Sequence, residues 1–172
     1  MARPAGAFNR LQMQPLPRHE PVGLLIAAAR RGLRQAAGKV ARRFKLPPQQ
    51  FWVLNAVLET DGPSLRELAD RMRIDEPTAS RIVAALVRRK LVRMDAHARD
   101  RRRARLVATT SGEALRADVA AAAAEMRVAI VAGFSAAEQD VLRDGLRRVI
   151  ANMERFGGTR PARSARAPRG AT

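Results

Sequence analysis

Two short amphipathic segments joined by a tight turn are the feature of the sequence that most limits its fold. The first segment is predicted to begin after Ser64, because Ser64 and Glu67 form a capping-box pair and the following apolar residues have the spacing of one buried helix face. The second is predicted to begin at Asp75, a good N-cap, with Pro77 in its first turn, where proline gives up no hydrogen bond. The pattern therefore predicts two helices that each bury a single face.

The second helix has an unusual outward face. Its apolar stripe is predicted to consist of Ala79, Ile82, Val83, Leu86 and Val87. At about 100° per residue, the side opposite this stripe is small, polar and cationic. That face and its flanks consist of Pro77, Thr78, Ser80, Arg81, Ala84 and Arg88. Such a face suits the DNA major groove, where arginine pairs with guanine and serine or threonine meets a base or a phosphate. A solvated helix surface is the alternative interpretation.

A β-hairpin is predicted after these helices. Apolar strands at 91–94 and 104–108 flank residues 97–103, which are predicted to form a charged loop. Residues 99–105 contain five arginines and one aspartate, and these arginines repel one another. A polyanion is their natural partner.

This order of elements resembles the winged helix-turn-helix of the MarR family of transcription regulators. The resemblance spans residues 21–156. It rests on Ser80-Arg81, on Leu86 with Leu91-Val92, and on Asp100-Arg101-Arg102 followed by Leu106, Thr110 and Gly112. It implies a mainly α fold, with a winged helix-turn-helix lobe, a small β-hairpin wing and a helical dimerisation region.

The resemblance also implies how the chain meets double-stranded DNA. The second helix would enter the major groove, Arg102 would reach the neighbouring minor groove, and Asp100 would shape the wing. The candidate DNA-binding residues are Ser64, Pro77, Thr78, Ser80, Arg81, Arg88, Arg99, Arg101, Arg102 and Arg103. Of these, Arg101 and Arg103 are expected to contact phosphates.

Two positions depart from the family pattern. Ala84-Ala85 stands where many members have an acidic residue followed by arginine, so the ion pair that often pins the wing to the recognition helix lacks its acidic partner. Lys90 stands where members usually have glycine in a left-handed turn. Both departures affect the expected orientation of the wing and the expected contacts with DNA bases, but neither removes the motif.

Composition limits the other functions that the chain could have. The 172 residues carry a net charge of +17, and residues 30–45 hold seven basic residues and no acidic one. The chain has no cysteine and only two histidines, His19 and His97, so a thiol switch, a metal site and a cofactor are not expected. No catalytic set or phosphate loop supports an enzyme. No signal peptide or membrane-spanning run occurs, and the expected location is the cytoplasm.

The remaining segments are predicted to frame the central lobe. A basic helix over 22–44 is followed by a helix ending at Glu59, and two long helices with apolar stripes follow the wing. The first of those is expected to start from a capping box at Thr110 and Glu113 and to run to Ala132, and the second to start from a capping box at Ser135 and Glu138. Residues 22–45 and 111–156 would form the dimerisation region and 64–110 the winged lobe. Residues 1–20 and 157–172 are expected to be a flexible basic arm and a basic tail.

The family resemblance also implies a small aromatic or amphipathic effector. Trp52 is a candidate for lining its pocket, and an ordinary core aromatic is the alternative for this residue. The function expected from the sequence is a homodimeric, sequence-specific regulator, a repressor that binds an inverted repeat and is released by a ligand. An architectural, nonspecific DNA-binding protein of the same fold is the alternative.

Overall fold

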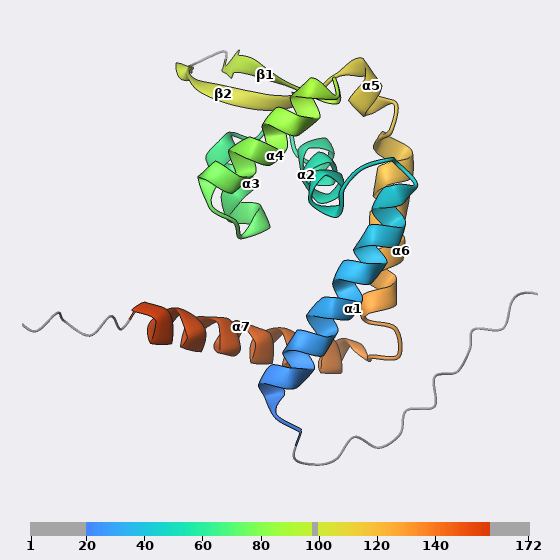
Figure 1. Cartoon of the computed structure of the whole chain (residues 1–172), viewed down its shortest axis with the longest axis vertical. Coiled ribbons are helices and arrows are strands. Elements are labelled where there is room, and N and C mark those ends of the chain that lie inside the picture. Colours follow the sequence, from blue (N-terminus) through green and yellow to red (C-terminus); the bar gives the residue numbers. More distant parts are fainter. Residues whose placement is uncertain (1–19, 98–99, 159–172) are drawn as a thin grey trace, which may run out of the picture. The chain divides into compact units, whose positions relative to one another are not determined.

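The computed structural model describes residues 20–97 and 100–158, and these are mainly helical with one two-stranded antiparallel sheet (Figure 1). The elements are α1 (Val22–Arg42), α2 (Pro48–Glu59), α3 (Leu65–Met72), α4 (Glu76–Arg88), β1 (Val92–His97), β2 (Asp100–Ala108), α5 (Thr110–Glu113), α6 (Arg116–Ile130) and α7 (Ala136–Gly158). The chain divides into two compact units, Met1–Arg127 and Val128–Thr172. The winged-helix fold expected from the sequence is confirmed.

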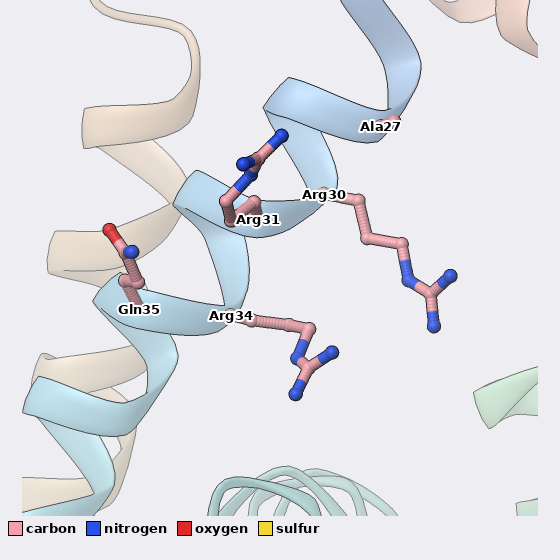
Figure 2. Close-up of a pocket in the computed structure, with 5 residues that line it drawn as sticks. All are labelled: Ala27, Arg30, Arg31, Arg34 and Gln35. Atoms are coloured by element: carbon pink, nitrogen blue, oxygen red, sulfur yellow. The ribbon is translucent and has the colours of Figure 1, made fainter. Parts of the chain in front are cut away.

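Helix α1 has one buried face and one basic face. Ala37, Val40 and Ala41 are buried near its C-terminal end. Arg30 and Arg34 are exposed and extend to the same side of the helix (Figure 2). Beyond the end of α1, Arg43 donates to Glu125 of α6 at 2.6 Å, an exposed pair that contributes little to stability.

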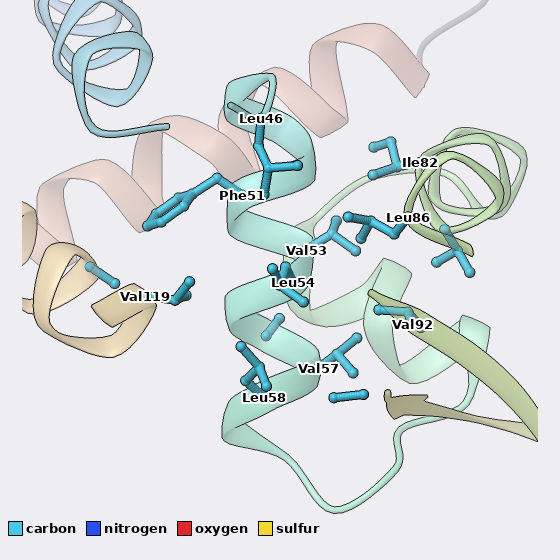
Figure 3. Close-up of a cluster of buried hydrophobic side chains, with 14 of the residues drawn as sticks. Leu46, Phe51, Val53, Leu54, Val57, Leu58, Ile82, Leu86, Val92 and Val119 are labelled. Atoms are coloured by element: carbon cyan, nitrogen blue, oxygen red, sulfur yellow. The ribbon is translucent and has the colours of Figure 1, made fainter. Parts of the chain in front are cut away.

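Helix α2 is the centre of the hydrophobic core (Figure 3). The sequence predicts a single buried stripe through Phe51, Leu54 and Leu58, but Val53, Ala56 and Val57 are also buried. The helix is buried on most sides because α1, α3, α4, α5 and β2 all pack around it. Helix α2 therefore joins most elements of the first unit into one core.

Helices α3 and α4 begin where their caps predict. Ser64 Oγ accepts from the Glu67 N–H at 3.2 Å and Glu67 Oε2 accepts from the Ser64 N–H at 2.8 Å, so the capping box is formed. Asp75 caps α4. The predicted buried stripe of α4 holds from Ala79 to Leu86 but not for Val87, whose side chain is 39% exposed.

Lys90 adopts the left-handed conformation that the family usually gives to glycine, with a φ of 58°. This conformation costs a residue with a Cβ about 1 kcal/mol. The Lys90 carbonyl accepts a hydrogen bond from Thr109 Oγ1 at 2.5 Å, which helps to hold the turn. The departure from the family pattern therefore leaves the backbone path of the turn intact.

The hairpin is longer than the sequence predicts. Its strands pair from Val92 with Ala108 to Ala96 with Ala104, and then shift register to pair His97 with Asp100. The prediction of a loop over 97–103 is wrong, because Asp100–Arg103 belong to β2. Strand pairing outweighs the weak strand preference and the repulsion of consecutive arginines, a long-range effect that local pattern does not reveal.

The segment after the wing also differs from its prediction. Thr109, not Thr110, caps α5, with its Oγ1 accepting from the Gly112 N–H at 3.1 Å. Glu113 pairs with Arg116 instead of closing a capping box. The chain turns after α5, so the predicted single helix is divided into α5 and α6, and α6 ends at Ile130 rather than at Ala132.

Helix α7 forms most of the described part of the second unit. Its predicted capping box is confirmed, since Ser135 Oγ accepts from the Glu138 N–H at 3.3 Å and Glu138 Oε2 accepts from the Ser135 N–H at 2.8 Å. The Ser135 N–H is the main cause that lowers the pKa of Glu138. Within the described ranges, no helix combines the length and apolar character that crossing a bilayer requires.

Candidate nucleic-acid interface

The outward face of α4 has the composition and exposure that the sequence predicts. Pro77, Ser80, Arg81 and Arg88 are exposed, whereas Thr78 is half-buried. The opposite side of the helix is fixed in the core by Ala79, Ile82, Val83 and Leu86. A rigidly held helix therefore presents a hydroxyl and two guanidinium groups to its surroundings.

A chain of hydrogen bonds orients Arg81 at the start of α4. Asp75 Oδ1 accepts from the Thr78 N–H at 2.7 Å, and Asp75 Oδ2 accepts from Thr78 Oγ1 at 3.0 Å. Arg81 in turn donates from Nη2 to Thr78 Oγ1 at 3.0 Å. The cap of the helix thus also positions the arginine that the sequence assigns to DNA.

The same contacts lower the pKa of the Asp75 carboxyl, first through the backbone N–H of Thr78 and then through its hydroxyl. The ionised carboxylate accepts both bonds, so folding favours the charged form. The stabilisation is complete above the pKa of Asp75 in the unfolded chain. It is lost as the pH falls through the lower pKa of the folded state.

We therefore expect the Asp75→Asn variant to lose less stability than the wild type when the pH falls from about 5 to about 2, since the unperturbed Asp pKa is about 3.9. Urea unfolding at a series of pH values measures this slope. Ser80→Ala, on the same helix, removes no titrating group and should keep the wild-type slope. Equal slopes for Asp75→Asn and the wild type would contradict the cap.

The hydrogen-bonding groups of Ser64 are used in the cap of α3. Its hydroxyl donates to Glu67 Oε2 at 2.8 Å and accepts from the Glu67 N–H, and its own N–H is bonded to the same carboxylate. A structural role as the cap of α3 accounts for these contacts. Its assignment to DNA stays a prediction.

The wing arginines are placed only in part. Arg99 lies outside the described residues, as do the side chains of Asp100, Arg101, Arg102 and Arg103. The backbone of the last four forms the start of β2, where the register shifts. The DNA contacts assigned to these wing residues stay predictions. The flexible arm over 1–20 and the basic tail over 157–172 also stay predictions, because both fall almost wholly outside the described residues.

A hollow of about 500 Å³ lies on α1, lined by Ala27, Arg30, Arg31, Arg34 and Gln35 (Figure 2). Within the described part of the chain, no acidic side chain pairs with these three arginines. The sequence shows them as part of the basic run over 30–45, which has no acidic residue, but does not assign them to a site.

Trp52 does not line this hollow. Its ring meets the ring of Phe51 edge-on, with the centroids 5.0 Å apart and the planes at 78°, and the residue is half-buried. These contacts are those of an aromatic residue at the edge of the core. Its role in a ligand pocket stays a prediction.

The chain is similar to known regulators. The MarR family model matches residues 44–103, the stretch from α2 to the wing. No curated protein matches the chain. The solved structure of the transcriptional regulator PA3341 is 31% identical, with a TM-score of 0.65, and the match covers 78% of this chain and 99% of that one.

Two further solved structures have a similar fold. BpsR from Bordetella bronchiseptica, whose DNA binding is regulated by 6-hydroxynicotinic acid, is 27% identical with a TM-score of 0.65, over 77% of this chain and 96% of its own. MepR from S. aureus, solved with DNA, shares the fold at 23% identity and a TM-score of 0.68, over 78% and 99%. The family model on the helix-turn-helix and wing, together with a relative matched over nearly its whole length, shows that this chain belongs to the MarR family of transcriptional regulators.

Proposed function

We propose that the protein is a dimeric repressor that binds an inverted-repeat operator through α4 and the wing. The observation that carries the proposal is the exposed face of α4, on which Asp75 and Thr78 hold Arg81 in place. A guanidinium that is already oriented loses little freedom when it forms a bidentate contact with guanine. Ser80 and Arg88 are exposed on the same helix.

The wing completes the proposed interface. Arg102 would enter the minor groove, Arg101 and Arg103 would contact phosphates, and Asp100 would shape the hairpin. The MepR structure supports this arrangement at the level of the fold, since that protein was solved as a complex with DNA. A regulator of this kind acts on DNA in the cytoplasm and is not an enzyme.

The dimer is proposed from the apolar stripe of α7. Leu142, Leu146, Ile150 and Met153 follow helical spacing and are each at least 39% exposed. Exposed apolar stripes of this length mark an interaction surface. We propose that residues 22–45 and 111–156 form the dimerisation region. A two-fold dimer then places two copies of α4 in successive major grooves about 10 bp apart.

An effector is proposed from the hollow on α1. Arg30, Arg31 and Arg34 have no acidic partner among the side chains that the structure describes, and their guanidinium groups suit a carboxylate. BpsR, a relative of the same fold, is regulated by 6-hydroxynicotinic acid, an aromatic acid. We infer that a small aromatic or amphipathic anion regulates DNA binding by this protein.

Selection of bound DNA from a random library at physiological salt tests the proposal. An enriched inverted repeat with half-sites about one helical turn apart is the expected result. Binding without an enriched motif, and with steep dependence on salt, would overturn it in favour of the architectural alternative.

Arg81→Ala is expected to reduce discrimination between the selected operator and mutated sites by about 1–3 kcal/mol, because a bidentate base contact is lost. Titrations of operator and mutated duplexes by fluorescence anisotropy measure the ratio of affinities. Arg66→Ala, which removes an exposed arginine from α3, should leave that ratio unchanged. An equal loss on all duplexes for Arg81→Ala would make it a phosphate contact.

A further inference from the structure

One arginine side chain attaches the β-hairpin of the wing to a turn between two helices. Arg105 of β2 reaches the turn between α2 and α3, where its Nε donates to the Gly62 carbonyl at 3.1 Å and its Nη2 donates to the Asp61 carbonyl. Nη2 also lies 3.2 Å from Asp61 Oδ1. One guanidinium therefore binds two consecutive carbonyls and a carboxylate, although 43 residues separate Arg105 from Gly62.

The turn is shaped to receive this group. Gly62 has a φ of 65°, and a Cβ built on it would lie 2.5 Å from Arg105 Nε and 2.7 Å from Nη2. The lack of a side chain at Gly62 thus leaves the space that the guanidinium occupies. Beside it, the Leu106 N–H donates to the Pro63 carbonyl at 2.9 Å, and Ser64 forms a β-bridge with Arg105.

Val92 and Leu106 bury the hairpin's apolar side in the core, but among the described side chains no other polar group of the hairpin bonds to the helices or their turns. Ala84-Ala85 of α4 cannot supply the carboxylate that pins the wing in many members of the family. Arg93 of β1 pairs with Asp95 of its own strand. Arg105 is only 31% exposed, whereas the Arg93 side chain is 56% exposed.

We propose that Arg105 is the positioning residue of the wing. It fixes the hairpin to the turn after α2 and so sets the direction in which the wing meets DNA, in place of the missing ion pair with α4. The inference rests on the proposed function, in which the wing contacts DNA. The fork of a guanidinium suits several acceptors at once, whereas a lysine ammonium acts as a point charge.

The first test uses the full chain without DNA. Hydrogen exchange of the Leu106 amide should accelerate by about tenfold in Arg105→Ala and in Arg105→Lys, because the clamp protects the neighbouring bond to Pro63. Arg93→Ala is the control, because it removes another arginine from the same hairpin. In this variant the Leu106 amide should exchange at the wild-type rate. Wild-type protection in both Arg105 variants would overturn the proposal.

The second test compares affinities for operators with A·T-rich and G·C-rich flanks. A wing arginine in a narrow minor groove prefers A·T-rich flanks. The ratio of the affinity for the A·T-rich operator to that for the G·C-rich operator should fall toward one in both Arg105→Lys and Arg105→Ala. The same ratio should stay at its wild-type value in Arg93→Ala. Full preference in Arg105→Lys would show that only the charge matters and would overturn the positioning role. A wild type without the preference would count against the proposed wing contact, and the exchange result alone would then decide the clamp.

Discussion

The double substitution Leu146→Glu and Ile150→Glu is expected to convert the proposed dimer to a monomer and to abolish tight binding to the proposed operator. These side chains are 44% and 40% exposed on the α7 stripe. Complete burial of such a side chain contributes about 1.5–3 kcal/mol, so burying the exposed part contributes about 1 kcal/mol. A two-fold interface contains each side chain twice, which gives about 4 kcal/mol, or about a thousandfold in the dissociation constant.

Sedimentation velocity over a range of concentrations measures the change in oligomeric state, and operator titration measures its consequence. Ala137→Glu with Ala151→Glu is the matched control, because it adds the same charge at exposed positions on the other side of α7. The control should remain a dimer. A double variant that sediments as a dimer would show that the α7 stripe is not the interface.

Gly112→Ala is expected to lower the free energy of unfolding by about 2–3 kcal/mol, at the upper end of the usual cost of overpacking. A Cβ at Gly112 would lie 2.1 Å from the Leu91 carbonyl oxygen and 3.1 Å from the Leu91 carbonyl carbon. Both atoms are backbone, so they cannot turn aside as a flexible side chain would. The same region is held by the Thr109 N–H, which donates to the Leu91 carbonyl at 3.1 Å.

Urea unfolding at a fixed protein concentration measures this loss. Gly38→Ala is the control: this helical glycine of α1 has open space around the added Cβ. That substitution should leave stability unchanged or raise it by up to about 1 kcal/mol, because alanine favours helix. A Gly112→Ala variant as stable as the wild type would show that α5 can move away from the Leu91 carbonyl at little cost.

Local chemistry made much of the fold predictable. Ser64 with Glu67, Asp75, and Ser135 with Glu138 all cap the helices expected of them, because a cap depends on residues only three positions apart. The left-handed turn at Lys90 is different, because it was expected from the family resemblance and not from local chemistry. The face of α4 followed from helical periodicity, which one buried stripe is enough to define.

The errors come from contacts, or from a lack of cover, that the pattern of residue types does not specify. Residues 100–103 were expected in a loop because arginines have weak strand preference, but pairing with β1 places them in β2. The capping box expected at Thr110 and Glu113 was displaced because Thr109 is tied to Lys90 and Arg116 takes the carboxylate of Glu113. Val87 was assigned to the buried stripe of α4, but the packed elements do not cover it.

The sequence by itself determined where α3, α4 and α7 begin, which face of α4 is exposed, and that the chain resembles the MarR family. Each of these depends on short spacings or on a local motif. Only the tertiary structure decided that α2 is buried on most sides, that Gly112 touches Leu91, and that Arg105 clamps the turn at Gly62. The physical reason is that these contacts join segments far apart in the chain, and no local pattern of residue types specifies which distant atoms will meet.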